Sequence, residues 1–300
     1  MSSDINLHEL AENIIKIGLS LGADQVEAYT IFGAARNVQL ERSSIRRFTD
    51  VSNSGLGVRI IKNKAIGMAS TTIFTTESIE RTVKDAVSLA KVTPPDENFI
   101  SLPEDERSTP VINGCFDQRV IDLSVEKFTE MILEGVQEAE VRDDAIVGGS
   151  FTAGHSERFI INSQGIDRFS EQTSITGYLS VKLQDGDDIG NAYYFDSSKV
   201  LGDFDYLLIG QEAGKRALKM LGSQKIESSS LPILLDPDSS MGTISPILSS
   251  GINAFDVFNK TAYFIDKIGD IIASDKLTIL DNPFYPGGVD SSAFDDEGVI

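Results

Sequence analysis

The order of hydrophobic patterns in this sequence predicts an α+β fold built on antiparallel sheets. Stretches with helical spacing alternate with groups of short strands that are joined by tight turns. A doubly wound parallel fold would instead alternate single strands with helices. A helix followed by a strand meander occurs twice. We therefore expect helices packed on antiparallel meander sheets in an N-terminal domain, residues 1–225, followed by the start of a β-rich second domain, residues 226–300.

The first helix and the first meander are marked by caps and by alternation. Ser3 or Asp4 is placed to cap the helix, and Gly22 is placed to end it. Beyond the helix, apolar and polar residues alternate in short runs, as in strands with one buried face. These strands are expected at residues 26–29, 37–41, 55–61 and 65–70.

A second helix follows the first meander. Thr75 or Thr76 is placed to cap it, and it ends before Pro94, because proline cannot continue a helix. The stretch 93–110 holds four prolines among acidic residues and serines, which indicates an ordered surface connector and not a domain boundary. Ser124 then caps a third helix.

The second meander spans residues 145–195 and contains an acidic turn at 185–188. That turn fits no complete calcium loop, so we interpret it as a plain turn. A helix over residues 203–221 follows, and the stretch "SQKIESSS" is the best candidate linker. An apolar strand then leads through Asp236 and Pro237 into a stretch with helical character, a junction where backbone N–H groups can converge on a ligand.

Composition limits the class of protein. The chain has 300 residues, 41% of them hydrophobic, which is enough for a sizeable core, and it shows neither a membrane span nor a signal segment. The single cysteine, Cys115, fits a reducing cytoplasm. The net charge of −20 disfavours direct binding of nucleic acid or of an anionic membrane. The one basic concentration, interpreted as the solvated face of a hairpin, comprises Arg42, Arg46, Arg47, Lys62 and Lys64.

Histidine is too scarce for a recognisable catalytic constellation. His8 stands in the first turn of the first helix, where we expect a solvated side chain, and its i+4 residue is Glu12, not a second histidine. His155 is expected near a turn between strands, and no nucleophile-elbow motif accompanies it. Cys115 would need a histidine beside it to act as a nucleophile, so a buried or half-buried thiol is expected. No metal ligands and no catalytic residues are predicted on this chain.

The densest acidic group is "FDDEG" at residues 294–298. Three interpretations stay open for it: a turn, a cation site, or a rim that binds arginine.

The chain resembles the TldD/PmbA family, also called TldD/TldE and historically "modulator of DNA gyrase". The stretches that carry the resemblance are "GLGVRIIKNKAIGMAST", "FIINSQG" and "LPILLDPDSSMGTISPILSS" followed by "KIGDIIASDKLTILDNP" and "SSAFDDEGV". In that family the TldD-type subunit is a zinc metallopeptidase with a His-Glu-x-x-x-His motif, whose glutamate acts on zinc-bound water. Counted back from Lys267, the motif falls on Ser245, Pro246 and Ser250 here.

The resemblance implies a PmbA/TldE-type subunit without zinc of its own. Serine is a poor zinc ligand, and the side chain of proline cannot act as a base. No cofactor is therefore expected on this chain, and zinc is expected on a TldD-type partner. The resemblance further implies a cytoplasmic hetero-oligomer or a self-associating chain that acts on peptides, with no direct contact to nucleic acid or membrane. Family members continue past "DDEG", so the second domain is expected to be incomplete at Ile300.

Two alternatives stay open. One is an independent hydrolase that uses Ser245 or Ser250 near a helix N-terminus, although no base is identifiable for it. The other is a scaffold module without catalysis that presents a sheet edge to an extended peptide.

Overall fold

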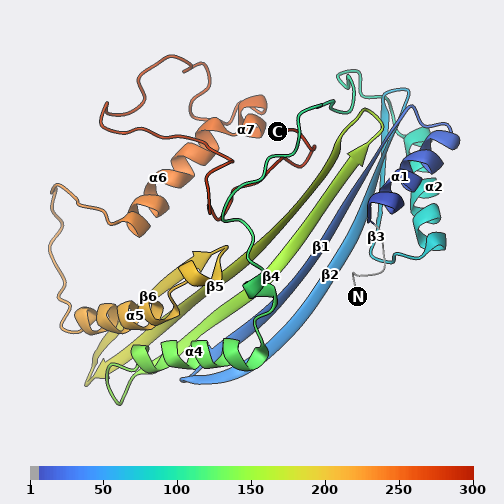
Figure 1. The fold of residues 1–300 in the computed structure, drawn as a ribbon. Helices are drawn as coiled ribbons and strands as arrows, with labels where there is room; N and C mark the ends of the chain where they lie inside the picture. Colours follow the sequence, from blue (N-terminus) through green and yellow to red (C-terminus); the bar gives the residue numbers. More distant parts are fainter. Residues whose placement is uncertain (1–6) are drawn as a thin grey trace. The chain divides into compact units, whose positions relative to one another are not determined.

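A single six-stranded antiparallel sheet organises this computed structural model, which describes residues 7–300 (Figure 1). The strand order is β3-β2-β1-β4-β5-β6. The two predicted meanders are therefore the two halves of one sheet, and they are joined by the pairing of β1 with β4. The α+β class with antiparallel pairing is thus confirmed. The strands are β1 (Gln25–Glu41), β2 (Ser44–Lys62), β3 (Ala65–Thr71), β4 (Ile146–Asn162), β5 (Asp167–Asp185) and β6 (Asp188–Ser198).

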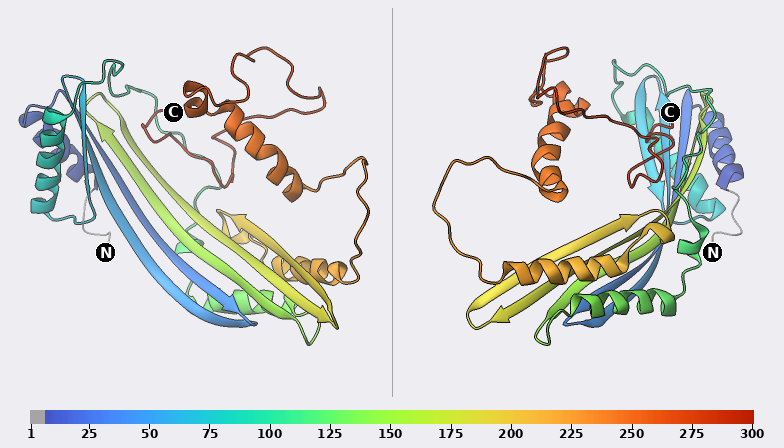
Figure 2. Two further views of the ribbon diagram at one scale, coloured as in Figure 1. Left: turned by 180° about the vertical axis from the view of Figure 1, so that it is seen from behind. Right: turned by 60° about the vertical axis from the view of Figure 1, so that its left-hand side comes forward.

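Four of these strands are long and curved (Figure 2). The alternating runs at 26–29 and 37–41 were expected as separate strands, but both belong to β1, which pairs with β2 over its whole length. The residues between them, Thr30 to Arg36, alternate poorly in polarity. Main-chain pairing to β2 on one side and β4 on the other keeps them extended all the same.

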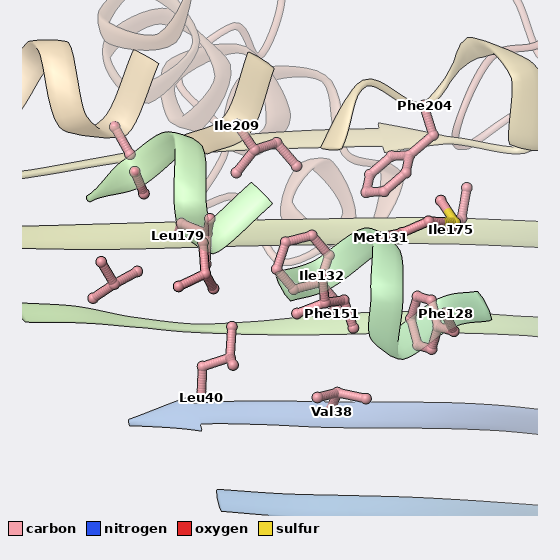
Figure 3. Packing of buried hydrophobic residues seen from close by; sticks show 14 of the residues in the cluster. Val38, Leu40, Phe128, Met131, Ile132, Phe151, Ile175, Leu179, Phe204 and Ile209 are labelled. Carbon is pink, nitrogen blue, oxygen red and sulfur yellow. The ribbon is translucent and has the colours of Figure 1, made fainter. Parts of the chain in front are cut away.

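Helices α1, α2, α4 and α5 lie on one face of the sheet, which we call the helix face; it carries Val26 and Val38 of β1. Near one end, Val26 packs in a core with helices α1 and α2. Near the other end, Val38 packs in a second core with α4 and α5 (Figure 3). The helices are α1 (Leu7–Ser20), α2 (Thr76–Val92), α3 (Gln118–Ile121), α4 (Val125–Ala139), α5 (Tyr206–Met220), α6 (Pro237–Ile252) and α7 (Ala254–Phe258), with a 3₁₀ turn η1 (Leu201–Asp203).

Helix ends follow the predicted capping chemistry with one shift. The hydroxyls of Thr75 and Ser124 accept the N–H groups of Ser78 and Lys127, at 3.3 and 3.1 Å, and so cap α2 and α4. The helix expected from residue 203 begins instead at Tyr206, because Asp205 is the residue that caps α5. The predicted caps Ser3 and Asp4 lie outside the described residues.

The opposite face of the sheet, which carries Tyr29 and Ile31 of β1, is called the open face. Residues 282–300 cover part of it: Phe294 packs there with Ile160 of β4 and Ile166 in a third buried cluster. The connector 93–110 is ordered and lies in the same compact unit, where Leu102 is buried and its N–H donates to Gln25. The connector is thus no boundary, as predicted.

The contacts divide the chain into two units, Met1–Ser223 with Asn282–Ile300, and Gln224–Asp281. The second unit contains α6, α7 and irregular chain. Between residues 226 and 300, where the sequence predicts the start of a β-rich domain, the structure contains no strand. Leu231–Leu235 before Asp236 is largely exposed and irregular, because a strand requires a paired neighbour and none lies beside it. The domain boundary expected after residue 225 stays a prediction.

Within residues 7–300, no helix combines the length and the apolar character that crossing a membrane requires.

Candidate functional site

Helix α6 holds the three residues at the expected metal-motif positions. Its start is well specified, since Asp236 accepts the N–H of Ser239 at 2.7 Å and Pro237 occupies the first helical position. Ser245, Pro246 and Ser250 all lie inside the helix and are exposed. Proline in the helix interior removes one helical hydrogen bond.

The side chains at these positions do not fit a zinc ion. Ser250 donates its hydroxyl to the carbonyl of Pro246, four residues earlier, at 3.0 Å. Ser249 donates to the same carbonyl at 3.3 Å. Zinc in proteins is held by imidazole, thiolate or carboxylate groups, and none of these stands at Ser245, Pro246 or Ser250. Among residues 7–300, no group of three or more His, Cys, Asp and Glu side chains is arranged to hold a metal ion.

The acidic group at residues 294–298 binds arginines and forms a turn, two of the three interpretations that the sequence left open. Asp295 closes the turn: its Oδ1 accepts the N–H groups of Glu297 and Val299, each at 2.9 Å. Gly298 adopts a positive φ of 80° in this turn. The next two carboxylates project toward arginines on the open face of the sheet.

Arg59 of β2 is the first of these arginines. Its guanidinium donates to Glu27 of β1 at 2.7 Å and to both carboxylate oxygens of Glu297. Burial alone would lower the pKa of Arg59, but the two carboxylates raise it above its usual value. Burial raises the pKa of Glu27, and Arg59 opposes that shift. The cluster joins two strands to the chain near its last residue.

Arg158 of β4 holds the same segment from the neighbouring side. It donates to Asp296 at 3.1 Å, to the hydroxyl of Ser292 at 2.6 Å and to the carbonyl of Phe294 at 2.6 Å. Its guanidinium carbon also lies 4.5 Å from the centre of the Phe294 ring, a cation–π arrangement.

Arg168 of β5 and Asp105 of the connector complete the attachment. Arg168 donates to the carbonyls of Gly298 and Asp105, at 3.2 and 2.7 Å. The Asp105 carboxylate accepts the N–H of Ile300 at 3.0 Å and two bonds from Arg107. Hydrogen bonds from the Arg107 side chain, with those from the backbone, lower the pKa of Asp105 well below its usual range.

Two cavities lie where this segment meets the sheet. One of about 500 Å³ is lined by Glu27, Arg59, Met68 and Glu297 among others. A second, of about 340 Å³, is lined by Tyr29, Arg158, Gln172 and residues 289–292. The arginines that line them already bind carboxylates of this chain, so they attach this segment to the sheet, and the two cavities lie beside that attachment.

The two histidines have different polar neighbours in the structure. His8 on α1 is half exposed, and its Nε2 lies 3.0 Å from Asp167 of β5, so it has a charged partner that the sequence prediction missed. His155 lies in the middle of β4, paired with Ala34 and Thr173, and not near a turn as predicted. It lines a small cavity of about 70 Å³.

Cys115 is buried, as predicted. It lines a cavity of about 260 Å³ that has no histidine among its lining residues, so the histidine that a nucleophilic thiol would need is not found there.

The predicted basic concentration is divided. Arg42, Arg46 and Arg47 lie at one end of the β1–β2 hairpin, and Lys62 and Lys64 lie at the other end of β2. The strand between them is 19 residues long, whereas only residues 55–61 were expected to be a strand, so charges that are near in sequence are separated in space.

Lys199 was missed by sequence reasoning. It is only 3% exposed, and its ammonium donates to Gln172 and to the carbonyl of Ser291, the latter at 3.2 Å. Burial lowers its pKa, and nearby Cys115 and Asp290 oppose that shift. In the sequence it follows two serines at the end of a strand, where a solvated lysine is normal.

Three family models match the chain in order. They are described as PmbA/TldA metallopeptidase domain 1 at residues 26–90, the central domain at 119–221 and the C-terminal domain at 228–300. The chain belongs to the PmbA/TldD metallopeptidase family. This membership confirms the resemblance that was read from the sequence.

Named members of the PmbA/TldD family match along nearly the whole chain. A metalloprotease PmbA homologue of Haemophilus influenzae is 24% identical, and the match covers 98% of this chain and 65% of that protein. A metalloprotease of Methanocaldococcus jannaschii is 22% identical over 98% of this chain and 65% of its own length. The chain thus spans about two thirds of these relatives.

Crystal structures of similar proteins share the fold. A putative modulator of DNA gyrase from Bacteroides thetaiotaomicron has a TM-score of 0.89 and 23% identity, over all of this chain and 69% of its own. TldE from Thermococcus kodakarensis has a TM-score of 0.81 and 24% identity, over 97% of this chain and 65% of its own.

Proposed function

We propose that this chain is a PmbA/TldE-like subunit of a heteromeric zinc peptidase that acts on peptides, and that it does not itself carry the zinc. The observation that carries the proposal is the chemistry of α6 in a member of a metallopeptidase family: Ser245, Pro246 and Ser250 supply neither ligands nor a base. The zinc would then belong to a homologous partner with the His-Glu-x-x-x-His motif. The single cysteine supports a cytoplasmic location.

An independent serine hydrolase is a weaker candidate. Ser250 donates its hydroxyl to helix carbonyls instead of to a base. A nucleophilic serine needs a base within hydrogen-bond reach. The chain's histidines, His8 and His155, lie on α1 and in β4, in the other compact unit.

The experiment is co-expression of this chain with a homologue that has the His-Glu-x-x-x-His motif, only one of the two being tagged. Size-exclusion chromatography with light scattering gives the mass, and elemental analysis gives the zinc content. We expect a mixed complex whose zinc follows the partner subunit, and peptide cleavage by that complex only. The matched control is the same complex with the partner's motif glutamate replaced by glutamine, which keeps the complex and loses cleavage.

Two results would contradict the proposal. One is that the two chains stay apart at micromolar concentration. The other is that this chain purified alone holds one zinc ion per molecule and cleaves peptides.

A further inference from the structure

Strand β6 and its neighbour β5 present a group of exposed aromatic rings on the open face. Tyr178, Tyr193 and Phe195 are 45, 57 and 48% exposed. Tyr178 of β5 stands directly opposite Phe195 of β6 and diagonally opposite Tyr193, and the two β6 rings are two residues apart on the same face. We call these three rings, with the outer edge of β6, the β6 strip.

The residue pattern of β6 is that of a strand covered on both faces. On the helix face, Ala192 and Tyr194 pack against the core that includes α5. On the open face, Ile189, Tyr193 and Phe195 are also apolar or aromatic, yet all three are exposed. Apolar residues on both faces are typical of a buried strand, whereas β6 is the last strand of the sheet. The sequence therefore anticipates a cover that the described residues of this unit do not provide.

The backbone of β6 is open along its outer edge. It pairs with β5 on one side. Within the compact unit that contains β6, as described over residues 7–223 and 282–300, no main-chain hydrogen bond reaches its other side between Ile189 and Phe195. Such an edge offers N–H and C=O groups at the spacing of an added strand. Only an extended polypeptide can use that row of donors and acceptors along its length.

The strip differs in charge from the rest of the chain. Lys182 is the only charged residue on the open face of β5 and β6 between Ser174 and Ser197, although the whole chain carries −20. Apart from Lys182, which is diagonal to Tyr193, the polar neighbours of the three rings on this face are serine, threonine and asparagine. Tyrosine beside small hydroxyl and amide side chains is the composition of surfaces that bind polypeptides, since rings give contact area and the small polar groups give adaptable hydrogen bonds.

We propose that the β6 strip binds an extended peptide segment as an added antiparallel strand, with alternate apolar side chains of the segment packed on Tyr178, Tyr193 and Phe195. This extends the proposed function by giving the peptide a docking surface on this subunit. A second copy of the chain is a poorer occupant, because two molecules of charge −20 repel each other. A strongly basic segment is disfavoured too, since the open face of β5 and β6 around the rings carries one positive charge, Lys182, and no carboxylate.

The test measures binding of a fluorescein-labelled peptide, ETFTLTFE, to this chain alone by fluorescence anisotropy. A peptide of the same composition with its apolar residues in one block, ETTFLFTE, controls for non-specific apolar binding. Two further peptides carry N-methyl groups on the threonine amides or on the amides of the apolar residues. Since an added strand uses only one of its edges, one of the two should keep binding and the other should lose it.

Replacing the rings tests the face of the strip. Tyr193→Ser and Phe195→Ser are each expected to weaken binding about tenfold or more, because aromatic anchors dominate such contacts. Val51→Ser is the matched control: Val51 is 40% exposed on the open face of β2, far along the sheet from β6, and binding should stay within about twofold. Circular dichroism checks that each variant is folded.

Several results would overturn the proposal. The first is that ETFTLTFE shows no binding up to about 1 mM, which corresponds to negligible affinity. The second is that ETTFLFTE binds as tightly as ETFTLTFE, or that the two N-methylated peptides bind equally well. The third is that Tyr193→Ser and Phe195→Ser leave binding of ETFTLTFE unchanged. Dimerisation of the chain at micromolar concentration that Phe195→Ser abolishes, without competition by the peptide, would assign the strip to a second copy. None of these results bears on whether a zinc-bearing partner exists.

Discussion

Arg59 and Glu27 form the most consequential buried pair in the sheet. Their side chains are 18 and 7% exposed, and Glu297 adds a second carboxylate. A buried charge that keeps its partner adds little net stability, but a buried charge that loses its partner is very unfavourable. The pair is therefore a sensitive point for substitution.

Arg59→Met should lower the free energy of unfolding at pH 7 by roughly 3–5 kcal/mol, because Glu27 is left buried and unpaired. Burial keeps the pKa of Glu27 raised, so the penalty should appear as the pH rises through that raised pKa and should disappear below about pH 4, where the carboxyl is neutral in both states. Urea denaturation at several pH values measures it.

The control for that substitution is Arg46→Met. Arg46 is 69% exposed and pairs with Glu41 at the surface. Its replacement should cost about 0–1 kcal/mol. Equal losses in the two variants, or a loss in Arg59→Met that does not depend on pH, would contradict the assignment of Glu27 as a buried charge.

Asp105→Asn tests the attachment of the last residues. The pKa of Asp105 lies below its unfolded value, so its contribution to stability is present above about pH 4 and is lost as the pH falls toward the folded pKa. The difference in unfolding free energy between wild type and Asp105→Asn should be largest near pH 7 and should shrink in acid. Asp143→Asn, at an exposed position, is the control and should change the unfolding free energy at pH 7 by no more than about 0.5 kcal/mol.

At the scale of elements, helix α2 approaches strand β3 so closely that Gly67 has no room for a side chain. A Cβ at Gly67 would lie 2.1 Å from the carbonyl oxygen of Ala86 and 2.4 Å from the nitrogen of Ala90. Both are backbone atoms of a helix and cannot rotate away. The packing of α2 on the sheet edge therefore depends on this glycine.

Gly67→Ala should destabilise the chain by about 1–3 kcal/mol or more, the usual effect of overpacking. Gly57→Ala is the matched control in the neighbouring strand, since a Cβ there would meet its nearest neighbour at 3.9 Å. Thermal unfolding followed by circular dichroism compares the two. If Gly67→Ala and Gly57→Ala unfold at the same temperature, α2 does not approach β3 as closely as described. The expected result is a midpoint for Gly67→Ala several degrees below that of Gly57→Ala.

Helix α6 shows how an element can be specified by its ends and weakened in its middle. Asp236 and Pro237 set its start, as the sequence indicates, while Pro246 interrupts its hydrogen bonding. The hydroxyls of Ser249 and Ser250 bond to the carbonyl of Pro246 within the same helix. A helix with this composition can present a surface, but its centre offers no acid, base or metal ligand.

At the scale of the whole molecule, the two compact units differ in how well they bury apolar residues. Two large cores lie against the sheet. Between residues 224 and 281, only Gly251 and Ala262 are buried. Leu234, Ile268 and Ile271 are almost fully exposed, at 99, 102 and 94%. Regions with few buried apolar contacts open at low free-energy cost.

Limited proteolysis with chymotrypsin should therefore cut first between residues 224 and 281, for instance after Phe255 or Phe258. Tyr193 and Phe169 are internal controls: they are exposed at 57 and 47%, but they lie within strands whose backbone is held in the sheet. Mass spectrometry identifies the first product. A first cut within β5 or β6 would show that the sheet is less stable than its packing implies.

Much of the fold could be predicted because its signals are local. The caps at Thr75 and Ser124, the stop at Gly22 and the alternation in the two meanders depend on neighbouring residues alone. The strand expected before Asp236 was wrong for the complementary reason, because an apolar run cannot supply its own pairing partner.

The sequence by itself determined the α+β class, the starts of α2, α4 and α6, the buried state of Cys115, the family, and the residues at the motif positions of α6. Only the tertiary structure decided that two meanders share one sheet through β1 and β4, that Arg59, Arg158 and Arg168 hold the acidic segment near Ile300, and that the rings of β6 stay uncovered. The physical reason is distance along the chain. Capping and alternation act between residues a few positions apart, whereas Arg59 and Glu297 are separated by 238 positions and meet only once the sheet has formed.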